Sequence, residues 1–140
     1  MKFKRLKEIR KKKKLKQQDI ADILNVERST YTGWENGKNT IPLKHLIKLC
    51  NYYKCSVDYL TKLSNKNEWC FITTDSNIIG NNIKQIRTKN NLRQKDIYNF
   101  LKISSSNYSA YETGKVLIST EAIYKMAKKY KFSIDSLLKK

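Results

Sequence analysis

A long internal repeat constrains the fold of this chain more than any other feature of its sequence. A shift of 77 positions aligns residues 6–63 with residues 83–140 without a gap, and 22 of the 58 aligned pairs are identical. The identical pairs include glutamine, glutamate, glycine and serine, so a lysine-rich composition does not account for them. Self-similarity of this kind marks a repeated structural unit. The sequence therefore predicts two copies of one fold, over residues 1–63 and 83–140, joined by a linker over residues 64–82.

Basic side chains dominate both copies. The chain holds 30 Lys and Arg against 12 Asp and Glu, which gives a formal net charge of +18 and a surface that attracts polyanions. Residues 1–63 carry 16 basic and 6 acidic side chains and residues 83–140 carry 13 and 4, whereas the linker carries 1 and 2. Nucleic acid is the default partner, but charge alone leaves DNA, RNA, an anionic membrane and a codon bias all open.

Several functional classes find no support in the sequence. No apolar run approaches the roughly 18 residues of a membrane-spanning helix, and the charged start Met1–Arg10 leaves no place for a signal peptide, so we expect a cytoplasmic chain. Cys50, Cys55 and Cys70 are spaced as neither a disulfide framework nor a metal knuckle, and His45 has no partner at ligand or triad spacing. We therefore expect no metal, no cofactor and no enzymatic activity.

The apolar periodicity of the first copy predicts five short helices. They are expected over residues 3–13, from Lys16 to about Asn25, over Arg28–Glu35, from Pro42 to about residue 53, and just after Ser56. Gly37 is expected to end the third helix in a left-handed conformation, and Ser56 to cap the last one. A tight turn between the second and third helices gives the all-α order of a helix-turn-helix domain.

A dense pattern of residues runs through these helices and recurs in the second copy. In the first copy it consists of Leu15, Gln17, Asp19, Ile20, Ala21, Leu24, Val26, Ser29, Tyr31, Trp34, Glu35, Asn36, Gly37 and Lys38, followed by residues 55–60. In the second copy it consists of Leu92, Gln94, Asp96, Ile97, Leu101, Ser106, Tyr108, Glu112, Gly114, Lys115, Ser133, Ile134, Asp135 and Leu137. The pattern closely resembles the Cro and repressor type of helix-turn-helix, the lambda-repressor-like or xenobiotic-response-element (XRE) family. The resemblance implies two tandem five-helix domains whose third helix enters the major groove of DNA.

The resemblance and the chemistry of the side chains together assign the DNA contacts. Base reading is predicted for Arg28, Ser29 and Thr32, with Gly33 letting the backbone come close, because an arginine at the tip of a recognition helix can bond guanine bidentately. The equivalent residues of the second copy are Ser105, Ser106 and Ser109. Phosphate contacts are predicted for Lys16, Gln17, Lys38, Arg93, Gln94 and Lys115. Since the second copy lacks a long donor, it reads bases by close approach, binds only backbone, or serves dimerisation or a protein partner.

Other residues are assigned to structure. The resemblance implies a partly buried salt bridge between Arg10 and Glu35, and a second between Arg87 and Glu112 at the matching positions. In the linker, the apolar cluster Trp69–Ile72 is costly to expose. We expect it to pack between the copies or against a second chain, with a short strand as one form.

The function predicted from the sequence is a sequence-specific regulator, bacterial or phage-encoded, that binds double-stranded DNA and represses transcription by occupying an operator. The two copies either imitate a repressor dimer within one chain or form a homodimer through the second copy. The main alternative is an antitoxin or phage-encoded inhibitor that holds another protein through the second copy or the Trp69 cluster. RNA binding is a third alternative, which the charge favours and the motif does not.

Overall fold

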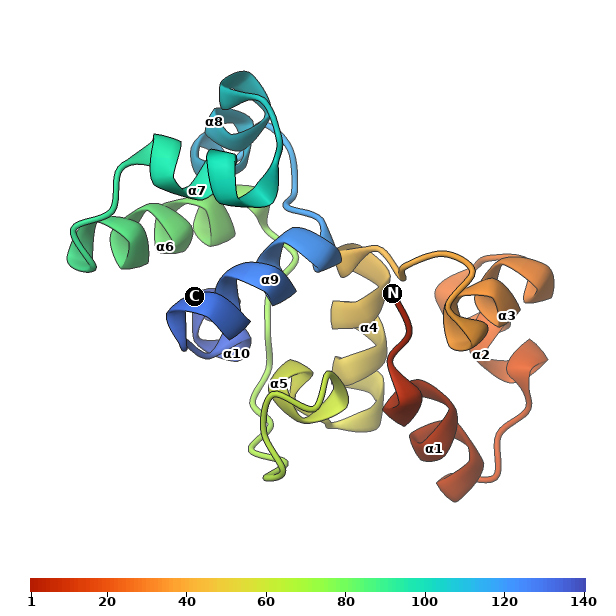
Figure 1. The fold of residues 1–140 in the computed structure, drawn as a ribbon. Helices are drawn as coiled ribbons and strands as arrows, with labels where there is room; N and C mark the ends of the chain where they lie inside the picture. Colours follow the sequence, from red (N-terminus) through yellow and green to blue (C-terminus); the bar gives the residue numbers. More distant parts are fainter. The chain divides into compact units, whose positions relative to one another are not determined.

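The computed structural model describes residues 1–140 and contains ten helices and no strand, as the sequence predicts (Figure 1). The chain divides into two compact units, residues 1–70 and residues 71–140. The first holds α1 (Lys4–Lys12), α2 (Gln17–Leu24), α3 (Arg28–Asn36), α4 (Leu43–Tyr53) and α5 (Val57–Leu60). The second holds α6 (Ser76–Lys89), α7 (Gln94–Leu101), α8 (Ser105–Thr113), α9 (Thr120–Tyr130) and α10 (Ile134–Leu137).

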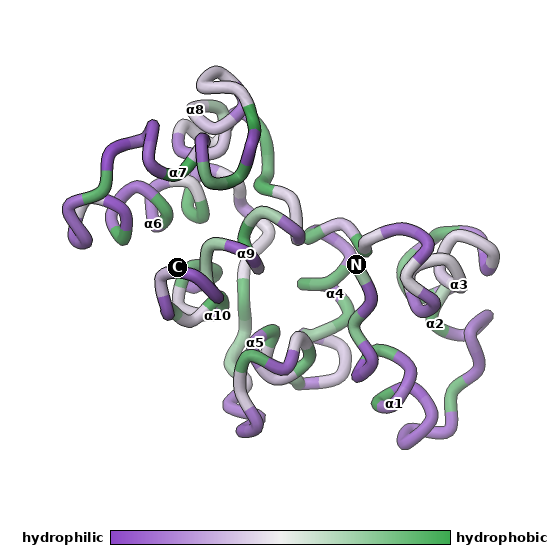
Figure 2. Tube along the Cα trace, in the orientation of Figure 1, coloured by the Kyte–Doolittle hydropathy of each residue, from purple (hydrophilic) through white to green (hydrophobic).

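Each helix of the first unit buries one face. Hydrophobic and hydrophilic residues alternate within the helical turns (Figure 2), and the hydrophobic ones form the core. The apolar stripe of α4 is fully internal, with Leu46, Ile47 and Cys50 at 0% exposure. Burying a side chain of this size contributes roughly 1.5–3 kcal/mol. Helices that are distant in sequence thus pack against one another around one small core. No helix of either unit has the length and apolar character that a membrane span requires.

The helix ends follow local chemistry in both units. Gly37 ends α3 at φ 84° and Gly114 ends α8 at φ 80°, a left-handed region that glycine enters without steric cost. Ser56 caps α5 by accepting a hydrogen bond from the Tyr59 N–H, and Ser133 caps α10 in the same way. The predicted C-cap at Gly37 and N-cap at Ser56 are both confirmed.

The residues expected to form a linker, 64–82, do not form a separate segment. The Asn67 side chain accepts a hydrogen bond from the Ser56 N–H at 2.8 Å, and the Trp69 indole donates to Asn51 Oδ1 at 3.2 Å. These contacts attach residues up to 70 to the first unit. The helix α6 already begins at Ser76, so the second unit starts well before residue 83.

The Trp69–Ile72 cluster is divided between the two units and does not form a strand. Trp69 is half-buried in the first unit, Ile72 is 1% exposed in the second, and Phe71 between them is 69% exposed. The expectation of a short strand is wrong for a physical reason. A strand needs a partner along its length, and after the cluster only the Thr73 N–H finds a distant backbone acceptor, the Leu138 carbonyl at 2.8 Å.

Close packing of α6 on α8 distinguishes the second unit. Gly80 occupies the position that Phe3 has in the first copy. A Cβ atom at Gly80 would lie against the backbone carbonyl oxygens of Tyr111 and Glu112, at 2.7 Å from the latter. Only a residue without a side chain therefore lets the two helix backbones approach this closely.

We predict that Gly80→Ala lowers the free energy of unfolding of the second unit by roughly 1–3 kcal/mol, because a rigid backbone has to move. The matched control is Gly33→Ala in α3, where an added Cβ meets nothing nearer than 3.8 Å. Alanine there is expected to stabilise the helix by up to about 1 kcal/mol. Urea denaturation followed by circular dichroism measures both variants. Equal stabilisation by the two alanines would show that α6 and α8 are not in close contact.

Candidate nucleic-acid interface

A three-residue turn sets the angle between α2 and α3. Asn25 follows α2 in the left-handed region at φ 55°, which a short polar side chain tolerates better than most. The Val26 N–H then bonds the Ala21 carbonyl at 2.9 Å, and α3 begins at Arg28. The second unit repeats this geometry, with Lys102 at φ 57° between α7 and α8. Both units therefore contain the helix-turn-helix that the sequence predicts.

The helix α3 has one buried and one exposed face. Tyr31 and Trp34 point into the core at 0% and 6% exposure, while Arg28 and Ser29 are exposed and Thr32 is half-buried. The guanidinium of Arg28 makes no hydrogen bond or ion pair with the rest of the chain. The three residues predicted to read bases thus share a surface that the fold leaves open.

Gly33 does not have the role expected of it. It is buried, and the nearest atoms to its Cβ direction belong to Lys38 and Asn39. The Asn39 N–H also donates to the Gly33 carbonyl at 3.3 Å. Gly33 is therefore covered by the segment after α3 and cannot bring the backbone close to DNA, because its side of the helix faces the protein.

A buried carboxylate joins the first three helices. Glu35 on α3 is 4% exposed and accepts from Arg10 Nε at 2.6 Å and from Arg10 Nη2 at 3.2 Å. It also accepts from Gln17 Nε2 at 2.9 Å and from the Tyr31 hydroxyl at 2.9 Å. Arg10 uses its remaining nitrogen to donate to the Leu15 carbonyl at 2.8 Å. The charge pair is satisfied on both sides, and it fixes α3 relative to α1 and α2.

The contacts of Glu35 decide its protonation. Burial raises the pKa of the carboxyl, but the hydrogen bonds from Arg10, Gln17 and Tyr31 outweigh it and hold the pKa below its usual range. The bond to Glu35 in turn raises the pKa of Arg10. Burial raises the pKa of the Tyr31 phenol as well, so its hydroxyl remains a donor. We call Glu35 and the three side chains that donate to it, Arg10, Gln17 and Tyr31, the cradle around Glu35. At neutral pH this cradle holds one full negative charge, on Glu35, and one full positive charge, on Arg10.

Two of the predicted DNA-contact residues, Gln17 and Thr32, are joined by a hydrogen bond. The Thr32 hydroxyl donates to Gln17 Oε1 at 2.8 Å, while Gln17 Nε2 donates to Glu35. One N–H of the Gln17 amide remains for a phosphate, and the Thr32 oxygen remains an acceptor. The N-terminus of α2 is thereby tied to the middle of α3, so the predicted phosphate contact and the predicted base contact belong to one rigid arrangement.

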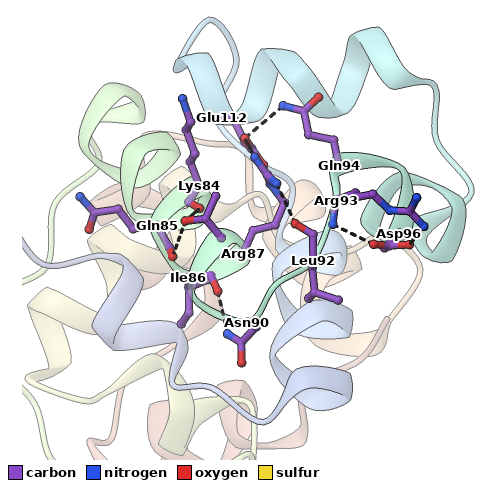
Figure 3. A network of polar contacts seen from close by, with 11 residues as sticks. Lys84, Gln85, Ile86, Arg87, Asn90, Leu92, Arg93, Gln94, Asp96 and Glu112 are labelled. Atoms are coloured by element: carbon purple, nitrogen blue, oxygen red, sulfur yellow. Dashed lines mark hydrogen bonds and ion pairs between the residues drawn. The ribbon is translucent and has the colours of Figure 1, made fainter.

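The second unit repeats the buried cradle (Figure 3). Arg87 donates to Glu112 from Nε at 2.6 Å and from Nη2 at 3.1 Å, and from Nη1 to the Leu92 carbonyl at 2.8 Å. Gln94 points to the same carboxylate from the start of α7, at 3.1 Å. Both ion pairs implied by the resemblance are thus present in the structure, with side chains nearly buried.

The exposed face of α8 differs from that of α3. Ser105 and Ser106 are exposed and Ser109 is half-buried, and no hydrogen bond joins Ser109 to Gln94. Ser104 caps α8 by accepting from the Asn107 N–H at 3.1 Å, whereas α3 has no side-chain cap at its start. One N–H at the N-terminus of α8 is therefore already bonded, and Ser105, Ser106 and Ser109 offer no long donor.

The predicted phosphate contacts lie at the ends of the same helices. Lys16 and Arg93 precede α2 and α7, and Lys38 and Lys115 follow α3 and α8; all four are exposed. Arg93 lies 3.5 Å from the carboxylate of Asp96, with its side chain 70% exposed. The hydrogen bond from the Arg93 backbone lowers the pKa of Asp96, which keeps this carboxylate ionised beside the helix start.

Sequence reasoning missed the polar role of one tyrosine. Tyr31 was predicted to be a core residue, and it is buried, but its hydroxyl also supplies one of the bonds to Glu35. The signal was present in the sequence, because Tyr31 lies four residues before Glu35 on one helix face. Tyr108 has the same spacing to Glu112, but its buried hydroxyl has no hydrogen-bond partner.

Comparison with known proteins finds a helix-turn-helix match in each unit. A family profile described as helix-turn-helix matches residues 6–60, and one described as helix-turn-helix domain matches residues 80–140. The chain is 46% identical over 57 residues to the uncharacterized HTH-type transcriptional regulator YqaE of Bacillus subtilis, an alignment covering 41% of this chain and 49% of the relative.

Other relatives give similar values. Identity is 43% over 58 residues with the SPbeta prophage-derived uncharacterized HTH-type transcriptional regulator YonR of Bacillus subtilis, over 41% of this chain and 54% of the relative. It is 38% over 60 residues with the HTH-type transcriptional regulator AnsR of the same organism, over 43% and 52%. The chain thus spans about half the length of the curated relatives it matches. No solved structure matches it.

Proposed function

Because this chain belongs to the helix-turn-helix family, with an XRE-type domain followed by a second helix-turn-helix domain, we propose that it is a DNA-binding transcriptional regulator. In this proposal α3 enters the major groove and Arg28 bonds the O6 and N7 atoms of a guanine. Ser29 and Thr32 contact neighbouring base edges. The observation that carries the proposal is the unpartnered guanidinium of Arg28 on an exposed helix face.

Phosphate contacts hold α3 in register on the duplex. The free N–H of Gln17 and the start of α2 point to one phosphate, and Lys16 and Lys38 add attraction that does not depend on sequence. Each neutralised phosphate steepens the dependence of affinity on salt. Because the cradle around Glu35 fixes α3 relative to α2, a phosphate bound at one helix positions the base readers on the other.

The experiment that tests the proposal compares three ligands across a salt series. These are a duplex selected from a random pool, a random duplex and a structured RNA. A specific regulator keeps the selected duplex about 1,000-fold tighter than random duplex as salt rises. Equal affinity for every duplex, or preference for the RNA, would remove the proposal.

The second unit is assigned a supporting role on DNA or a role in pairing chains. The positions of α8 that correspond to Arg28, Ser29 and Thr32 carry only serine hydroxyls, with the exposed amide of Asn107 beside them, and Ser104 caps the helix. We predict that residues 1–70 alone discriminate selected from random duplex at least about tenfold better than residues 71–140 alone, the difference that one arginine–guanine pair supplies. Fluorescence anisotropy measures both fragments after circular dichroism has verified that each is helical. Equal selectivity of the two fragments would contradict this ranking.

Repression by occupation of an operator extends the same proposal. Two units on one chain contact two unequal half-sites, or two chains pair through their second units and present two copies of α3. The footprint on the selected duplex separates these arrangements: symmetric half-sites indicate a homodimer, whereas one half-site with an unrelated flank indicates a single chain.

A further inference from the structure

The two units differ at a site whose positions correspond in the repeat. In the first unit the indole of Trp34 stacks on the imidazole of His45, with ring centroids 5.1 Å apart and an interplanar angle of 32°. Leu24 beside the turn is 2% exposed. The corresponding residues of the second unit are Tyr111, Ala122 and Leu101. An imidazole ring is thus missing from the second unit, and a phenol replaces the larger indole.

The missing volume is visible as a hollow. It measures about 210 Å³ and is lined by the apolar or aromatic residues Leu101, Ile103, Tyr111 and Ala122 and by the polar residues Ser119, Glu121 and Lys125. Leu101 and Tyr111 are half-buried, whereas their counterparts Leu24 and Trp34 are buried. Large-to-small replacement in a packed protein leaves space that neighbours fill only in part. In this respect the first unit is the filled form of the site and the second unit is the open form.

Three properties define what the hollow accepts. Its volume is below the 300–1,000 Å³ of sites for drug-sized ligands, so it holds a single ring. A planar ring beside Tyr111 would repeat the arrangement of His45 beside Trp34 in the first unit. The charge is balanced, because Lys125 at its edge is already paired with Glu121 at 2.9 Å, so neither side chain calls for an ionic ligand.

We propose that this hollow is a binding site for a small, neutral molecule with one aromatic ring, which takes the place that His45 fills in the first unit. Leu101, Ile103, Tyr111 and Ala122 give the hollow an apolar lining for a ring, and Ser119, Glu121 and Lys125 give it polar groups for a hydroxyl such as that of phenol. The ligand contacts Leu101, the last residue of α7, and Ile103, in the turn before α8. The ligand therefore contacts the turn between α7 and α8, the two helices of the helix-turn-helix in the second unit. The proposal does not depend on DNA binding, and its test uses no DNA.

The test is a titration of the full ¹⁵N-labelled chain with phenol, and with cyclohexanol as a non-planar molecule of similar size and polarity. Phenol is expected to cause saturable shifts confined to the amides around Leu101, Ile103, Tyr111 and Ala122. Binding of cyclohexanol is expected to be at least about tenfold weaker, because its ring cannot lie flat beside Tyr111.

Two variants exchange the filled and open forms. Ala122→His places in the second unit the residue that the first unit carries, and it is expected to weaken phenol binding at least about tenfold. His45→Ala opens the first unit and is expected to create a second phenol site, with new shifts near Leu24 and Trp34. The spectrum of each variant without ligand shows whether it folds. If Ala122→His does not fold, the presence or absence of a new phenol site in His45→Ala tests the proposal.

Three results would overturn the proposal: no saturable shift with phenol, equal binding of cyclohexanol, or unchanged phenol binding where Ala122→His is folded. Shifts of the same amides on concentrating the chain, without phenol binding, would identify a second copy as the occupant and would equally exclude the small molecule.

Discussion

Glu35→Ala is expected to lower the free energy of unfolding of the first unit by about 3–5 kcal/mol, because it leaves Arg10 charged and unpaired in a nearly buried position. A small domain of this kind has a total stability of only about 5 kcal/mol, so the variant retains about 0–2 kcal/mol, and between about 3% and half of the first unit is unfolded at room temperature. Urea denaturation of the full chain, followed by tryptophan fluorescence, measures the loss, because Trp34 and Trp69 both lie in the first unit.

The second unit supplies the matched control. Glu112→Ala removes the equivalent carboxylate, which pairs with Arg87, and it should weaken the second unit while leaving the transition of Trp34 in place. Replacing both Arg10 and Glu35 by apolar residues should be much less harmful than removing either one. If Glu35→Ala lowered the free energy of unfolding by less than about 1 kcal/mol, the Arg10–Glu35 pair would contribute no more than an ordinary surface ion pair.

The same carboxylate makes stability depend on pH. The pKa of Glu35 is lower in the folded chain than in the unfolded one, so the unfolded state binds a proton first as pH falls. Its contribution is therefore fully present above the unfolded value, near 4.3, and is lost as pH falls through the lower folded value. In Glu35→Gln the first unit should lack this part of the acid sensitivity.

Arg28→Ala is expected to relax base preference at one position of the selected duplex by about 1–3 kcal/mol, or about 5- to 150-fold. The reason is that the guanidinium has no partner within the chain, so its removal costs the fold nothing and removes only the contact to guanine. Selection from a random duplex pool with each protein measures the change as lost preference at that position.

Lys38→Ala is the control that distinguishes a base-specific contact from electrostatic attraction to the phosphates. Lys38 follows the left-handed Gly37 at the end of α3 and is exposed. Its removal should weaken binding to all duplexes alike and reduce the salt slope by about one. If Arg28→Ala behaved as Lys38→Ala does, with equal losses on every sequence, Arg28 would be a phosphate contact and the reading face would lie elsewhere.

The repeat explains why so much of the fold was predictable. Two copies of one pattern let each helix be identified twice, and the family resemblance implied the salt bridge between Arg10 and Glu35 and its counterpart in the second unit. Gly37 and Ser56 were equally predictable, because left-handed backbone and helix starts select those residue types.

What the sequence did not reveal depends on contacts between elements. The bond from Thr32 to Gln17 depends on the angle between α2 and α3, and periodicity carries no information about that angle. The expected linker was placed by the limits of the repeat alignment, which covers residues 6–63 and 83–140, but Asp75 caps a helix that starts at Ser76. Its apolar residues Ile79 and Ile83 have helical spacing, a signal that the repeat alignment hid because Gly80 stands where the first copy has Phe3.

Methylation interference on the selected duplex tests the central claim most directly. Dimethyl sulfate marks guanine at N7 in the major groove and adenine at N3 in the minor groove, so the two grooves give separate signals. The account predicts that methylation of one guanine N7 in the site bound by α3 blocks the intact chain, and that Arg28→Ala no longer senses it. Interference at adenine N3 alone, or at no base, would contradict the claim that α3 reads the major groove.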